Sequence, residues 1–151
     1  MKRLRVGAPE SDFKMTSTSV VVMEKGSDWL GPTGHAANVV LFGDESAELL
    51  RRTREKLGAL RRTNHRVDTA VLACNSSTSR RASEERTCLA RTLLGAFTGA
   101  VPGRLVLSAG GGASSRLRRD LLALLGTLTE ERIAPTVTVS LRFLAQSKAT
   151  H

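Results

Sequence analysis

The sequence predicts a single small α/β domain, built on a mainly parallel five-stranded sheet with helices packed on it. Short apolar runs alternate with amphipathic stretches in the order β-β-α-β-α-β-α-β, so that each helix lies between two strands. Such connections form right-handed crossovers between parallel strands. The length of 151 residues is typical of one domain, and 40% hydrophobic with 25% charged residues is ordinary for a globular chain.

Apolar or β-branched runs predict five strands, at 19–24, 38–42, 67–73, 105–107 and 136–143. The run at 67–73 is almost continuously apolar, as expected for a strand with both faces covered. In the last run Val137, Val139 and Leu141 alternate with polar residues, which is typical of a half-exposed edge strand. An edge strand can pair with a second copy of the chain, so a homo-oligomer formed through this strand is one expectation.

Three amphipathic stretches predict helices at 45–62, from 83 onward and at about 115–128. Asp44 can cap the first helix, and Glu45 and Glu48 then lie at the positive end of its dipole. Ser83 is predicted to cap the second, after a polar loop at 75–81. The predicted apolar stripes are Leu49, Thr53, Leu57 and Leu60; Leu89, Ala90, Leu93, Leu94 and Phe97; and Leu117, Leu121, Leu124, Leu125 and Leu128.

The domain is expected to span 19–145. Residues 1–18 are polar and irregular and carry Lys2, Arg3 and Arg5, which predicts a flexible basic arm. Residues 146–151 are predicted to form a short tail.

The chain is strongly basic, with 23 Lys and Arg against 14 Asp and Glu and a net charge of +9. An excess of this size attracts polyanions and acidic partners. Arg51, Arg52 and Arg62 lie on the predicted exposed face of the first helix and are candidates for phosphate contacts with nucleic acid. Aromatic residues make up only 3% of the chain, which argues against a base-stacking platform. A nucleic-acid-associated accessory protein is therefore one alternative.

The most suggestive motif joins the fourth strand to the third helix. It comprises Gly110, Gly111 and Gly112, then Ser114 and Ser115, then Arg116, Arg118 and Arg119. Glycines allow backbone N–H groups to approach an anion, and the two serines can cap the helix or bind a phosphate oxygen. The arginines lie in the first turns, where the helix dipole disfavours cations. A bound anion would relieve this conflict, because arginine pairs readily with phosphate or carboxylate.

This motif lacks the Gly-Lys-Ser/Thr ending of a Walker loop and the Gly-x-Gly-x-x-Gly spacing of a dinucleotide fold. The sequence therefore favours a non-enzymatic binding or regulatory module. It is expected to recognise a nucleotide, a phosphorylated ligand or an acidic protein partner at residues 110–116. The loop at 75–81 could join this site if the two strand ends are neighbours.

A small enzyme is the other alternative, with a site at the end of the third strand. It would use Cys74, the loop at 75–79 and His35. The turn Cys74-Asn75-Ser76 resembles the catalytic turn of cofactor-independent aspartate and glutamate racemases. The resemblance implies that the Cys74 thiol would remove a proton from a substrate α-carbon. Cys88 lies within a predicted helix and lacks the Gly-Cys-Thr-His context of the second cysteine in that family.

Cys74 and Cys88 have no second Cys or His at metal-ligand spacing, so neither a metal nor a cofactor is expected. Two isolated cysteines fit a reducing compartment, and we expect a cytoplasmic protein. No apolar run approaches the roughly 20 residues of a membrane span, so no membrane association is expected.

Overall fold

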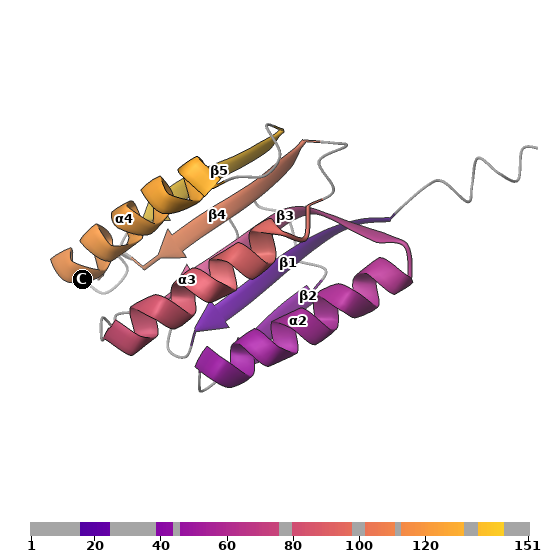
Figure 1. Cartoon of the computed structure of the whole chain (residues 1–151), viewed down its shortest axis with the longest axis horizontal. Coiled ribbons are helices and arrows are strands. Elements are labelled where there is room, and N and C mark those ends of the chain that lie inside the picture. Colours follow the sequence, from indigo (N-terminus) through magenta and orange to yellow (C-terminus); the bar gives the residue numbers. More distant parts are fainter. Residues whose placement is uncertain are drawn as a thin grey trace, which may run out of the picture.

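The computed structural model describes residues 16–24, 39–43, 46–75, 80–97, 102–110, 113–131 and 136–143. It confirms the predicted α/β domain, with five parallel strands in one sheet of order β2-β1-β3-β4-β5 (Figure 1). The strands are β1 (Thr16–Glu24), β2 (Val39–Gly43), β3 (His65–Cys74), β4 (Gly103–Ala109) and β5 (Val137–Phe143). The described helices are α2 (Ser46–Arg62), α3 (Arg80–Leu94) and α4 (Ser115–Glu131).

The direction in which the chain crosses the sheet reverses between β1 and β3. The steps from β2 to β3, from β3 to β4 and from β4 to β5 all run the same way, so right-handed crossovers place α2, α3 and α4 on one face (Figure 1). The step from β1 to β2 runs the opposite way. In open α/β sheets, ligands bind at such a reversal, beyond the carboxyl ends of the strands.

The main core lies between the sheet and the three helices. Alternate strand residues face this core and pack on the apolar stripes of the helices, among them Val20, Leu72 and Leu107 with Leu49, Leu93 and Leu121. The other face of the central strands carries a smaller cluster of Val21, Val71 and Val106. Burial on both faces explains why these strands are almost continuously apolar.

The strands extend beyond the predicted runs because backbone pairing continues past the apolar residues. β1 begins at Thr16, three residues earlier than predicted, and its added residues pair with the start of β3 from His65. β4 begins at Gly103, where a Cβ atom would lie 2.5 Å from Cδ1 of Phe97. Only glycine therefore lets the chain pass the Phe97 ring at this point.

The helix boundaries confirm some predicted signals and correct another. α2 ends at Arg62 as predicted, and Asn64 follows in the left-handed region with φ 59°, which is a common helix ending. The prediction that Ser83 caps a helix is wrong, because α3 already begins at Arg80. The Ser83 hydroxyl instead donates to Oδ1 of Asp120 on α4, at 2.9 Å. Asp44 and Glu45 lie outside the described residues.

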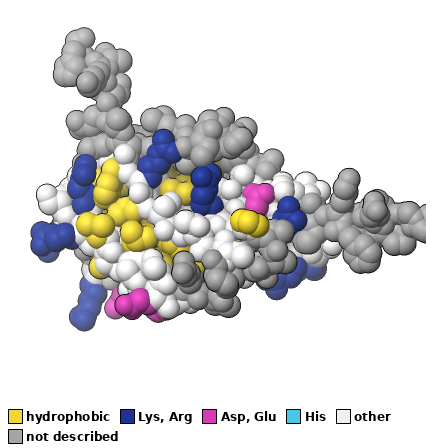
Figure 2. All heavy atoms as spheres, turned by 90° about the horizontal axis from the view of Figure 1, so that it is seen from above, with side chains coloured by type: hydrophobic (Ala, Val, Ile, Leu, Met, Phe, Trp, Pro, Cys, Tyr) yellow, Lys and Arg dark blue, Asp and Glu magenta, His cyan; other side chains and the backbone are white. Residues whose placement is uncertain are grey.

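β5 is an edge strand, as its alternating pattern predicted, with β4 as its one neighbour in the described sheet. Figure 2 views the molecule from the side of β5 and α4, where hydrophobic side chains gather among basic ones. Leu122 is 54% exposed, and Val139 and Leu141 are half-buried. Pairing of this edge with a second copy stays a prediction.

Within the described ranges, no helix is long and apolar enough to cross a membrane.

Candidate functional site

The candidate site lies at the carboxyl edge of the sheet. β1, β3 and β4 end there, and α3 and α4 begin there because each helix follows a strand directly (Figure 1). Two groups of side chains meet at this edge. One is an ion network centred on Arg86, and the other is the turn from Gly110 into α4.

Arg86 joins three elements through its guanidinium. Its Nε and Nη2 atoms donate to the two carboxylate oxygens of Glu24, at the end of β1, over 2.7 and 2.8 Å. Its Nη1 atom donates to Oδ2 of Asp120 on α4 over 3.0 Å. The backbone N–H of Asn75, just after β3, donates to the same Glu24 carboxylate over 2.8 Å. The network therefore binds α3 and α4 to the β1–β3 reversal point of the sheet.

Arg86 is almost completely buried, with 2% of its surface exposed. Burial alone would lower its pKa, but the hydrogen bond and charge of Glu24 raise the pKa above the ordinary value for arginine. Sequence reasoning missed this residue because a basic side chain on a helix is usually solvated. One signal was present, since Arg86 lies three and four residues before Leu89 and Ala90 and so belongs to the buried stripe.

Cys74 ends β3 directly beside this network and is buried. Its thiol donates to the carbonyl of Leu72 over 3.6 Å. Burial, and then the negative charge of Glu24, raise the pKa of the Cys74 thiol well above its ordinary value. The thiol is therefore protonated at neutral pH, whereas proton abstraction or nucleophilic attack requires the thiolate. Residues 76–79 and His35, the other members of the predicted enzymatic site, lie outside the described residues.

Alkylation of the two free cysteines is expected to separate them. In the folded protein, Cys88 is exposed and should react readily with iodoacetamide, whereas Cys74 should react at least about a hundredfold more slowly because it is buried and its thiol stays protonated. Mass spectrometry of the modified peptides over time measures both rates in one sample. A Cys74 that reacts as fast as Cys88 would contradict this assignment and favour the enzyme alternative.

The described part of the predicted glycine-serine motif lies between β4 and α4. The backbone N–H of Ala113 donates to the carbonyl of Gly110 over 3.1 Å, and Gly111 and Gly112 lie outside the described residues. Oγ of Ser114 accepts the backbone N–H of Leu117 over 3.1 Å and so caps the helix. Ser115 is the first residue of α4 and is exposed.

The three arginines of this motif differ in their surroundings. Nε of Arg118 donates to the carbonyl of Ala113 over 3.3 Å, and its guanidinium lies 4.5 Å from the centre of the Phe143 ring on β5. Arg116 and Arg119 are exposed and form no hydrogen bond or ion pair with any described residue. Arg118 therefore anchors the start of α4 to β5, while Arg116 and Arg119 are available to a ligand.

A comparison with α3 shows why these two arginines have no partner among the described residues. α3 also begins with two exposed arginines, but Arg80 and Arg81 each face a glutamate one turn later, with N–O distances of 3.9 and 3.7 Å. Arg116 has Asp120 at the corresponding position, yet the Asp120 carboxylate is bound by Arg86 and Ser83. The first turn of α4 contains no acidic residue.

The predicted nucleic-acid candidates lie on α2, with Arg51 and Arg52 in its first half and Arg62 at its last residue. Arg51 pairs with Glu55 over 2.7 Å and approaches Glu48 at 4.0 Å, so its charge is partly neutralised. Arg52 and Arg62 are exposed. A contact between this face and nucleic acid stays a prediction.

Across the described ranges, no group of three or more His, Cys, Asp or Glu side chains is placed to hold a metal ion. Comparisons of the chain with protein-family models, with curated proteins and with solved structures find no match.

Proposed function

We propose that this protein is a non-enzymatic α/β binding module that recognises an anionic ligand at the carboxyl edge of its sheet. The ligand would contact the turn from Gly110 and the arginines at the start of α4. The observation that carries the proposal is the lack of a described partner for Arg116 and Arg119, at a helix end that disfavours cations.

The ion network supports the same assignment. Asp120 is the acidic side chain closest in sequence to the arginines of α4, and its charge would oppose an anion bound there. Arg86 pairs with Asp120 and thereby offsets part of its negative charge. The positive charge of Arg116 and Arg119, which no described residue pairs, then acts together with the N–H groups of the first helical turn.

Gly110 leaves room for a ligand to approach the backbone. A Cβ atom built on Gly110 would have no heavy atom within 4 Å, so neighbouring side chains do not require glycine at this position. We therefore expect Gly110→Val to leave the unfolding temperature unchanged. The new side chain would project into the space that the ligand occupies and weaken binding.

The test uses pyrophosphate as the probe and calorimetry as the measurement. The variant Arg116→Gln/Arg119→Gln is expected to bind pyrophosphate at least about tenfold more weakly than the original chain, because it loses two charge-assisted hydrogen-bonding groups. Without ligand, the same variant should be as stable as the original or slightly more stable, since the removed cations oppose the helix dipole.

Arg80→Gln/Arg81→Gln is the matched control. It removes two positive charges from the start of a neighbouring helix at the same edge, but these arginines already face glutamates. The control variant should retain pyrophosphate affinity within about twofold. Equal weakening in both variants would mean that only net charge matters, and unchanged binding in Arg116→Gln/Arg119→Gln would refute the site.

A further inference from the structure

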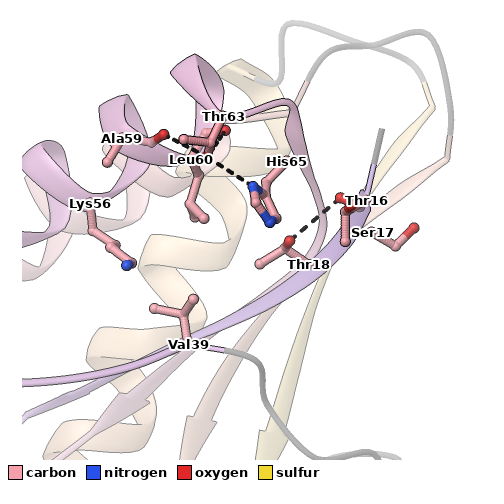
Figure 3. Close-up of a pocket in the computed structure, with 9 residues that line it drawn as sticks. All are labelled: Thr16, Ser17, Thr18, Val39, Lys56, Ala59, Leu60, Thr63 and His65. Carbon is pink, nitrogen blue, oxygen red and sulfur yellow. Dashed lines mark hydrogen bonds between the residues drawn. The ribbon is translucent and has the colours of Figure 1, made fainter. Parts of the chain in front are cut away.

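A cavity of about 350 Å³ opens at the opposite edge of the sheet, between the last turns of α2 and the starts of β1, β2 and β3 (Figure 3). This volume is within the range of small-molecule pockets in proteins. Val39, Ala59 and Leu60 form an apolar wall, and hydroxyl groups from the start of β1 line the facing side. The cavity is therefore amphipathic and separate from the site proposed at the carboxyl edge.

His65 contributes a ring nitrogen to this cavity. Oγ1 of Thr63 donates to the carbonyl of Ala59 over 2.9 Å, and it lies 2.9 Å from Nδ1 of His65. The contact with Thr63 fixes the orientation of the imidazole ring, and the tautomer decides which of the two atoms donates. The other ring nitrogen, Nε2, is left to form a hydrogen bond with a polar group of a ligand.

Lys56 supplies the charge of the cavity. Its side chain extends from α2 so that the ammonium group points toward Val39 (Figure 3). It forms no ion pair with any described residue, and the residues known to line the cavity include no Asp or Glu. A half-buried ammonium group beside an apolar wall is stabilised by an anion that pairs with it.

We propose that this cavity binds a small organic anion, with its carboxylate or phosphate on Lys56 and its apolar body against Val39 and Leu60. A polar group of the same ligand would form a hydrogen bond with Nε2 of His65. The inference does not depend on the site at α4, because the two sites lie at opposite edges of the sheet and share no residue.

The experiment titrates the full chain with benzoate and with phenyl phosphate and follows its amide resonances by NMR. Both anions are expected to shift the amide resonances of residues 16–18 and 63–65 saturably. Benzyl alcohol lacks the negative charge and inorganic phosphate lacks the apolar body, so each should bind at least about tenfold more weakly. Lys56→Gln should weaken binding of both aromatic anions at least about tenfold.

Arg54→Gln is the matched control, since it removes one positive charge from the same helix at a position that lines a different hollow, between α2 and α3. It should change the affinity by less than about twofold. Both variants are expected to fold, because neither cation pairs with a described residue. Absence of saturable shifts at millimolar anion, or equal weakening by Lys56→Gln and Arg54→Gln, would overturn the proposal.

Discussion

Replacing Arg86 with alanine is expected to destabilise the folded protein by about 3–5 kcal/mol, the usual effect of removing one partner from a buried ion pair. The guanidinium is 2% exposed and forms ion pairs with Glu24 and Asp120, whose side chains are 13% and 27% exposed. Without it, two carboxylates remain close together at the carboxyl edge with no cation between them. Urea denaturation, monitored by circular dichroism, measures the change in the free energy of unfolding.

Arg91→Ala is the matched control on the same helix. Arg91 also binds a carboxylate through two hydrogen bonds, to Glu131 over 2.8 and 2.7 Å, but both side chains are largely exposed. An exposed pair of this kind contributes little to stability because solvent screens it. A similar decrease in the free energy of unfolding for Arg86→Ala and Arg91→Ala would contradict the expectation that burial makes the Arg86 ion pairs important for stability.

If Arg86→Ala does not fold, a triple variant tests the same electrostatic role. Glu24→Gln/Asp120→Asn removes the two negative charges that require the arginine. Adding Arg86→Met to that pair is then expected to give a folded protein, because no buried charge is left without a partner. A triple variant that also fails to fold would show that Arg86 acts through packing alone.

Leu121→Ala is expected to destabilise the protein by about 3–5 kcal/mol, through the lost apolar burial and the cavity that remains. Leu121 is completely buried in the main core, where α4 packs on the sheet. The same substitution at the next residue provides the control. Leu122 is 54% exposed, so Leu122→Ala should change the free energy of unfolding by less than about 1 kcal/mol.

Both leucine variants are measured by urea denaturation under identical conditions. They change the same residue type on the same helix, so the difference between their free energies of unfolding shows which face of α4 packs on the sheet. Equal effects at Leu121 and Leu122 would mean that α4 does not pack as described.

The fold class was predictable from the sequence because it depends on local patterns. Apolar runs and helical stripes identified five strands and three helices, and alternation along 137–143 placed the last strand at an edge. Strand order was not predictable, because it depends on which distant segments pair. Nothing local indicates that β1 lies between β2 and β3.

The candidate site was only partly predictable, because part of it depends on contacts between residues that are distant in the sequence. The conflict between the α4 arginines and the helix dipole is local, and the sequence revealed it. The Arg86 network is not local, since Arg86 lies 62 residues from Glu24 and 34 from Asp120. The wrong prediction for Ser83 has the same origin, because its hydroxyl bonds to Asp120 across the helix interface.

The most direct test of the central claim is an NMR map of pyrophosphate binding on the original chain at moderate salt. We expect the largest amide shifts at Gly110 and at 113–119, where the turn and the first helical residues would face the anion. Shifts spread over the arginines of α2 and α3 to the same extent would contradict a defined anion site. In that case the net charge of +9 alone would explain the binding.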